Sequence, residues 1–177
     1  IYPMDFEEFL TASSQSQLSN ILKTADWDTI DILKTKYIEL LRQYYYIGGM
    51  PEVVDSYFKH HDLAEVRNKQ KEILDSYRRD ISKHTTGTES MRIGQVLNSL
   101  PSQLAKENKK FIYSALRKGA RASDFELAIQ WLLDAGIIHK VNRVKEIRMP
   151  LKFYEDFNAF KLFLLDCGLF GCMANAP

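Results

Sequence analysis

The chain has 177 residues, of which 45% are hydrophobic and 12% aromatic, enough to fill the core of one large domain or two small ones. Its formal net charge is only +1, so a charged surface can arise only if charge is segregated along the chain. The longest apolar run, Leu162–Leu165, is far shorter than the roughly 20 residues that span a bilayer. Two cysteines, Cys167 and Cys172, are too few for a disulfide framework or a four-ligand zinc site. We therefore expect a globular protein in the cytoplasm.

The first part of the sequence predicts helices. Asp5 and Glu8 have the spacing of a capping box at the start of a brief helix, and a Ser/Gln-rich break follows over residues 13–19. A second helix begins at about Thr29 and ends near Tyr46. Its apolar residues recur at helical spacing: Ile30, Leu33, Tyr37, Leu40, Leu41 and Tyr44.

Glycine and proline then separate this helix from the next one. Gly48 and Gly49 end the helix, and Pro51 suits a first helical turn, where a missing amide hydrogen is tolerated. A longer helix opens at Asp62 and carries an apolar stripe as far as Ile81. The segment HTTGTE, residues 84–89, has the composition of a linker, and we place a boundary there between two domains, residues 1–84 and 88–177.

The second part predicts a winged helix. After a helix from about Glu89, residues 109–144 combine a short basic helix, a turn, an amphipathic helix and a strand. Ser123 and Glu126 have the spacing of a capping box for the amphipathic helix, and Gly136 suits the left-handed residue that ends it. Residues 137–144 and 159–165 are expected to pair as strands. The predicted fold class is mainly α, with a helical bundle followed by a winged-helix domain that has a small β-wing.

Five segments, taken together, resemble the carboxyl-terminal half of a large family of prokaryotic AAA+ ATPases of the STAND-related type: GGMPEVV, YRRDIS, SLPSQL, FELAIQWLLDAGII and FKLFLLDCGLF. In that family a nucleotide-binding core ends in a segment similar to YPMDFEEFL, a helical lid with a GG-x-P turn follows, and an uncharacterised winged-helix domain comes next. The resemblance implies that residues 1–82 are the end of the core and the lid, and that residues 88–169 are the winged helix. Many members finish with a restriction-nuclease-like domain. Because the chain also opens without an initiator region, we expect a fragment of a longer protein.

The sequence contains neither a G-x-x-x-x-G-K-[ST] phosphate loop nor an apolar strand ending in paired acids that could hold magnesium. We therefore expect ATP and Mg²⁺ only in the presumed full-length protein, with no hydrolysis and at most weak nucleotide binding by this chain. By resemblance, the lid turn lies near the nucleotide, which makes Gly48, Gly49 and Pro51 the nucleotide-proximal candidates. A tight connection between two helices would use the same residues for packing alone.

No group of residues has a catalytic or metal-binding pattern. His60 and His61 are adjacent, so on a helix they point about 100° apart and cannot share a metal as residues one turn apart do. His84 lies four residues after Asp80, but no nucleophile is near in sequence. We assign no catalytic and no metal-binding residues, and whether the chain acts within an enzyme depends on its presumed ATPase parent.

Charge is segregated along the second part of the chain. Residues 105–122 hold six basic residues and one acidic residue, and residues 139–152 hold five and one. The helix between them, within residues 123–136, has three acidic residues and no Lys or Arg, and only Gln130 is suited to reading bases. We therefore predict that any DNA contacts are to phosphates and come from the basic residues on either side of this helix: Lys109, Lys110, Arg117, Lys118, Arg121, Lys140, Arg143 and Lys145.

These expectations describe an accessory fragment of an AAA+ ATPase. Its lid would close on nucleotide bound elsewhere, and its winged helix would bind DNA phosphates without sequence preference, or a partner domain. The expected partners are the missing amino-terminal ATPase core and a carboxyl-terminal nuclease-like domain. Two alternatives stay open: a free-standing winged-helix DNA-binding regulator, which the acidic helix disfavours, and a winged helix that serves only in protein interaction.

Overall fold

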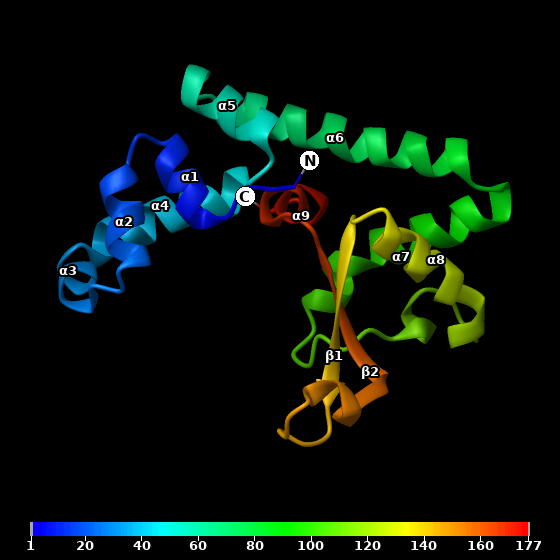
Figure 1. The fold of residues 1–177 in the computed structure, drawn as a ribbon. Helices are drawn as coiled ribbons and strands as arrows, with labels where there is room; N and C mark the ends of the chain where they lie inside the picture. Colours follow the sequence, from blue (N-terminus) through cyan, green and yellow to red (C-terminus); the bar gives the residue numbers. More distant parts are fainter. Residues whose placement is uncertain (1, 177) are drawn as a thin grey trace. The chain divides into compact units, whose positions relative to one another are not determined.

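Helices account for most of the computed structural model, which describes residues 2–176, and a two-stranded antiparallel sheet is the only sheet among them (Figure 1). This confirms the mainly helical fold class with a small β-wing. In the described part of the chain, no helix is both long enough and apolar enough to cross a membrane. In chain order the elements are α1 (Phe6–Ala12), α2 (Ser16–Lys23), α3 (Trp27–Ile32), α4 (Lys34–Ile47), α5 (Pro51–His60), α6 (Leu63–His84), α7 (Gly87–Leu104), the 3-10 turn η1 (Tyr113–Ala115), α8 (Ala122–Asp134), β1 (Ile138–Val144), η2 (Leu151–Tyr154), β2 (Glu155–Leu164) and α9 (Cys167–Met173).

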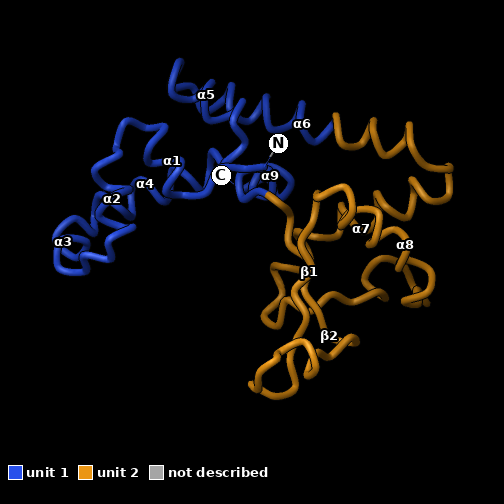
Figure 2. Tube along the Cα trace, viewed as in Figure 1, with its two compact units in different colours: residues 1–75, 166–177 blue, residues 76–165 orange. Residues whose placement is uncertain are grey.

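The chain forms two compact units (Figure 2). Unit 1 comprises residues 1–75 and 166–177, and unit 2 comprises residues 76–165. These ranges differ from the predicted division into residues 1–84 and 88–177. The last residues join unit 1 because α9 packs on α4, and because Asp166 accepts a hydrogen bond from the Gly49 amide. The end of α6 belongs to unit 2, where His84 and Thr85 line a pocket together with residues of α7 and α8.

The start of unit 1 contains one confirmed prediction and one wrong one. The capping box of α1 is present: the Asp5 amide donates to Glu8 Oε2 at 2.9 Å, and the Glu8 amide donates to Asp5 Oδ1 at 2.8 Å. The Ser/Gln-rich stretch, however, is helical, because α2 buries Leu18 against Leu10, Tyr37 and Leu40. An apolar face on a short helix thus outweighs the turn-forming composition of its polar residues.

The single helix predicted from Thr29 is divided in two. Asp26 caps α3, accepting from the Thr29 amide at 3.2 Å, and Leu33 leaves helical geometry with φ −92° and ψ 9° before α4 begins. The predicted end of the second helix is confirmed: Gly48, with φ +81°, follows the last residue of α4, and Pro51 is the first residue of α5.

Most of the HTTGTE segment lies in helices and does not form an extended linker. His84 is the last residue of α6, and Gly87 is already the first residue of α7, so only two residues of the segment lie outside helices. Thr86 caps α7: the Glu89 side chain accepts from the Thr86 amide at 3.1 Å and from its hydroxyl at 2.8 Å. The preceding Thr85 hydroxyl donates to the Ile81 carbonyl at 2.6 Å. These bonds satisfy backbone groups at both helix ends.

In unit 2, α7 packs on α8 and on β2. The predicted capping box of Ser123 and Glu126 is wrong, because α8 begins one residue before Ser123, and the Asp124 carboxylate accepts from the Arg121 amide at 3.1 Å instead. The predicted end of α8 is confirmed: Gly136 has φ +68°. The short basic helix expected before α8 is reduced to the single turn η1.

β1 and β2 form the predicted hairpin, although β2 starts earlier than expected, at Glu155. The pairing is interrupted by an irregularity, since Asn142 lies opposite Phe160 whereas Arg143 lies opposite Asp156. Residues 157–159 therefore have no partner in the register, as in an extended bulge. The hairpin continues beyond the strands, where the Lys145 amide donates to the Tyr154 carbonyl at 2.8 Å.

Candidate phosphate-binding surface

The two glycines of the GG-x-P turn have a packing role within unit 1. A Cβ atom on Gly49 would overlap the backbone of Met4, and one on Gly48 would overlap the carboxylate of Asp166. That carboxylate accepts from the Gly49 amide at 2.6 Å and from the Leu169 amide at 2.8 Å, and burial raises its pKa. Close backbone packing thus accounts for both glycines, and the proximity of Gly48, Gly49 and Pro51 to a nucleotide stays a prediction.

Charge divides between the two units. Unit 2 carries sixteen Lys and Arg residues against nine Asp and Glu, a net charge of +7, whereas unit 1 carries eight against fourteen, a net charge of −6. The near-neutral total therefore hides one acidic unit and one basic unit. A surplus of this size on 90 residues attracts polyanions, above all at low ionic strength.

Part of the surplus gathers around one pocket of unit 2, with a volume of about 420 Å³. Three basic residues from three segments line it: Lys110 from the loop after α7, Arg143 from β1 and Lys161 from β2. The carboxamides of Asn108 and Asn142 also line it. The loop is held on the sheet because the Phe111 amide donates to the Phe160 carbonyl at 2.9 Å.

Arg143 is positioned by a carboxylate. Its guanidinium donates a short hydrogen bond to Asp156, whose other oxygen accepts from the Asn158 amide at 3.1 Å. The bond from Arg143 is the main cause that lowers the pKa of Asp156, so this carboxyl is ionised at neutral pH. A guanidinium has five N–H donors, so most of them stay available to a ligand, and two-thirds of the Arg143 side chain is exposed.

Asn142, which also lines the pocket, has one side-chain atom without a hydrogen-bond partner. Its Nδ2 donates to Glu155 Oε2 at 2.9 Å, while its Oδ1 is buried and has no hydrogen-bond partner among the described residues. A buried carboxamide oxygen without a donor is uncommon in a folded protein. This oxygen is therefore an unpaired polar atom in the wall of the pocket.

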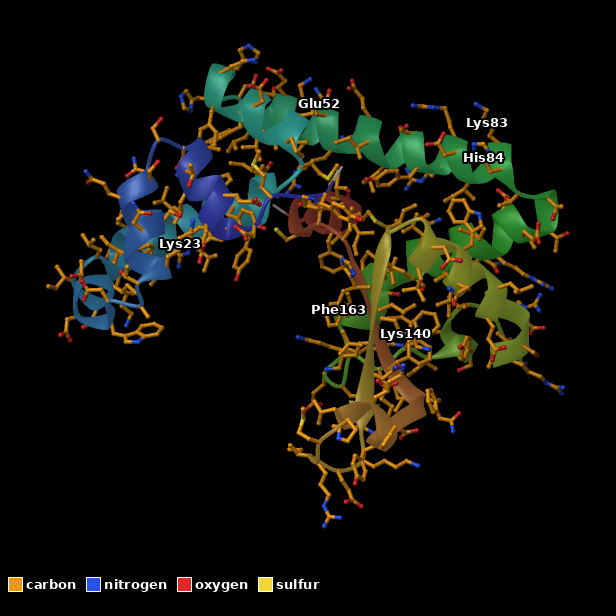
Figure 3. The ribbon with its side chains drawn as sticks, viewed as in Figure 1. Lys23, Glu52, Lys83, His84, Lys140 and Phe163 are labelled. Carbon is orange, nitrogen blue, oxygen red and sulfur yellow. The ribbon has the colours of Figure 1, made fainter. Side chains whose placement is uncertain are left out.

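The other predicted phosphate contacts are distributed more widely over unit 2. Lys140 lies on the opposite face of the hairpin from Phe163 (Figure 3), and its Nζ is 4.4 Å from the centre of the Phe160 ring. Arg117 pairs with Asp124 at 3.2 Å, which offsets part of its charge. The remaining candidates are exposed: Lys109, Lys118, Arg121 and Lys145. The structure thus joins two predicted residues, Lys110 and Arg143, in one pocket and adds Lys161. Lys161 was visible in the sequence as the one charged residue of the predicted strand 159–165, but its spatial neighbours were not.

The acidic helix α8 is poorly suited to reading bases. Gln130, its one residue of the right type, donates its side-chain amide to Asp134 Oδ1 at 2.7 Å. Asp124 is engaged at the start of the helix, where the bond from the Arg121 amide is the main cause that lowers its pKa. A negative charge held on this face would repel phosphates.

No set of three or more His, Cys, Asp or Glu side chains suited to a metal ion occurs within residues 2–176. No curated protein and no solved structure matches the chain. A family model described as a domain of unknown function, DUF8612, matches residues 38–177, which is well over half of the chain. The match includes all of unit 2 and the GG-x-P turn, and on this basis the chain belongs to the DUF8612 family.

Proposed function

We propose that this chain is an accessory part of an AAA+ ATPase whose unit 2 binds nucleic-acid phosphates without reading sequence. The observation that carries the proposal is the clustering of Lys110, Arg143 and Lys161 around one pocket of a unit with a net charge of +7. Lys and Arg that neutralise phosphates release condensed counterions, which favours binding at low salt.

The hairpin supplies a rigid component of this surface. Asp156 holds the Arg143 guanidinium in place before a ligand arrives, so little side-chain entropy is lost on binding. Lys110 and Lys161 have longer, more mobile stems and act as point charges. Since Gln130 is already paired with Asp134, base edges have no prepared partner on α8. These features favour contacts to phosphates over contacts to bases.

The resemblance to AAA+ ATPases supports the wider setting. In that setting unit 1 contributes the GG-x-P turn to a lid, while the phosphate loop, ATP and Mg²⁺ belong to a core that this sequence does not contain. Unit 2 then couples the ATPase to nucleic acid, or to a nuclease-like domain.

A salt titration with duplexes of random and defined sequence tests the proposal. With about three to five phosphates neutralised, the logarithm of affinity should fall against the logarithm of salt concentration with a slope of about −3 to −4.5. The double variant Arg143→Gln/Lys161→Gln should flatten the slope by about two units, because each lost contact removes about one.

The matched control is Lys34→Gln/Lys36→Gln, which removes the same charge from the acidic unit 1 and should leave the slope unchanged. A strong preference for one duplex sequence, or no binding at low salt, would contradict the proposal.

A protein partner for unit 2 is the second candidate, and one observation favours it. A groove of about 650 Å³ runs beside α8, and its lining includes Leu127 and Phe157, whose side chains are 78% and 71% exposed. Large exposed apolar residues beside a groove are typical of interaction sites. This candidate gains support if the chain fails to bind duplexes at low salt but Leu127→Ser/Phe157→Ser disrupts co-purification with the ATPase core.

A further inference from the structure

The end of the β1–β2 hairpin carries an apolar cluster that phosphate binding does not require. We call residues 145–154 the hairpin tip. Three of its side chains are almost fully exposed: Ile147 at 92%, Met149 at 84% and Phe153 at 83%. Single exposed apolar residues are ordinary on protein surfaces, but three within seven residues of one loop form a candidate interaction site.

The hairpin tip is held by hydrogen bonds of its own backbone. The Lys145 amide donates to the Tyr154 carbonyl at 2.8 Å, which closes the loop directly beyond the last paired residues of the strands. Within the tip, the Phe153 amide donates to the Pro150 carbonyl at 3.1 Å, and Arg148 pairs with Glu146 at 3.4 Å. The apolar side chains are therefore presented on a narrow two-stranded support, and little ordering is needed when they meet a partner.

The charges of the hairpin tip indicate what that partner is. Lys145, Arg148 and Lys152 outweigh Glu146, which leaves a net charge of +2. A partner that suits both features has anionic groups outside and apolar surface within. Duplex DNA has this chemistry, because phosphates flank the grooves and the faces of stacked bases lie between them. Arg143, a predicted phosphate contact, lies in the same hairpin two residues before the tip.

We propose that the hairpin tip inserts Ile147, Met149 and Phe153 between adjacent base pairs and unstacks them. The inference rests on the proposed function, since phosphate contacts from unit 2 must hold the duplex while the tip enters. Apolar wedges of this kind open a base step and kink the duplex without reading base edges. Three side chains are also too few for a stable protein interface, which needs roughly 1,000 Å² of buried surface. Since pyrimidine–purine steps unstack most easily, binding should be slightly tighter to any duplex that contains TA steps, whatever its other sequence, because this preference comes from deformability and not from reading bases.

The test uses the complete chain and a duplex with 2-aminopurine beside a TA step, because the fluorescence of this base rises when it leaves the stack. Binding should raise the fluorescence about twofold or more. The triple variant Ile147→Ser/Met149→Ser/Phe153→Ser should lose the rise but keep the salt slope, since it changes no charge. All three positions are on the surface, so the variant should fold.

The matched control is Ile32→Ser, which removes an 82% exposed side chain from α3 in unit 1. This variant should leave the fluorescence rise intact.

Each remaining outcome decides the question. Duplex binding without a fluorescence rise overturns the wedge but leaves the proposed function standing. A rise that survives the triple substitution also overturns it, and so does a rise lost with Ile32→Ser. Failure to bind any duplex at low salt overturns both proposals. Binding to vesicles containing phosphatidylserine, lost in the triple variant while duplex fluorescence stays flat, identifies a membrane surface as the occupant instead.

Discussion

Individual residues in unit 1 are constrained by backbone packing. Gly48 and Gly49 leave no room for a Cβ atom, and Gly168 is in the same position, because a Cβ there would overlap the Ile47 carbonyl. Beside them, the Cys167 thiol lies 3.6 Å from the Tyr44 carbonyl, and burial raises the pKa of this thiol to about 11. The thiol therefore stays protonated at neutral pH, which agrees with a structural role for this cysteine.

Gly49→Ala should destabilise the protein by about 2–3 kcal/mol, because the new methyl group must displace the Met4 backbone. Urea denaturation followed by circular dichroism measures the change. Gly94→Ala is the control: Gly94 lies within α7 with no atom near the added methyl group, so this change should raise the free energy of unfolding by about 0.5–1 kcal/mol. Equal stability of the two variants would contradict the packing seen around Gly49.

At the scale of elements, side-chain caps determine where one helix ends and the next begins. α6 ends and α7 begins within the HTTGTE segment, and Thr86 with Glu89 closes the start of α7. Hydrogen bonds from Thr86 lower the pKa of Glu89, so this acid is ionised in the capping box at neutral pH. Threonine and glycine there form helix ends, although their composition is also typical of a flexible linker.

Thr86→Ala should lower the free energy of unfolding by about 1 kcal/mol, because the α7 start loses its side-chain cap. In a Trp27→Phe background, the fluorescence of Trp131 reports on unit 2 alone during denaturation. Thr88→Ala changes the same side chain two residues further on, at an exposed position, and should have little effect. If both variants behave alike, the capping box contributes nothing measurable.

At the scale of the whole molecule, the two units have opposite charge. Unit 2 holds the lysines of the proposed phosphate surface, whereas several lysines of unit 1 pair with acids: Lys23 with Glu7, Lys59 with Asp55 and Lys69 with Glu52. Nucleic acid should therefore be restricted to unit 2.

Acetylation of lysines in the presence and absence of a saturating duplex, read by mass spectrometry, tests this restriction. The duplex should protect Lys110 and Lys161 in unit 2, because bound phosphates shield their amino groups. Lys34, Lys36 and Lys71 in unit 1 should react equally in both samples. Protection spread evenly over both units would mean that the charge division does not direct binding.

Much of the fold could be predicted from the sequence because local rules act within a few residues. The α1 capping box, the Gly48 and Pro51 boundaries and the Gly136 helix end each follow from the conformational preference of one or two residues. The pairing of the two strands was also predicted, whereas its antiparallel direction and register came from the structure. The α2 helix was missed because its stability comes from Leu18 packing against residues of α1 and α4.

The sequence by itself determined the helical fold class, the main helix ends and the surplus of basic residues around the acidic helix. Only the tertiary structure decided that the final residues belong to unit 1, because this depends on Asp166 reaching Gly49, 117 positions away in the chain. Likewise, only the tertiary structure joined Lys110, Arg143 and Lys161 at one pocket, since strand register and the loop attached to Phe160 set which side chains are neighbours. Local propensity acts over one helical turn, whereas these contacts depend on how distant segments pack.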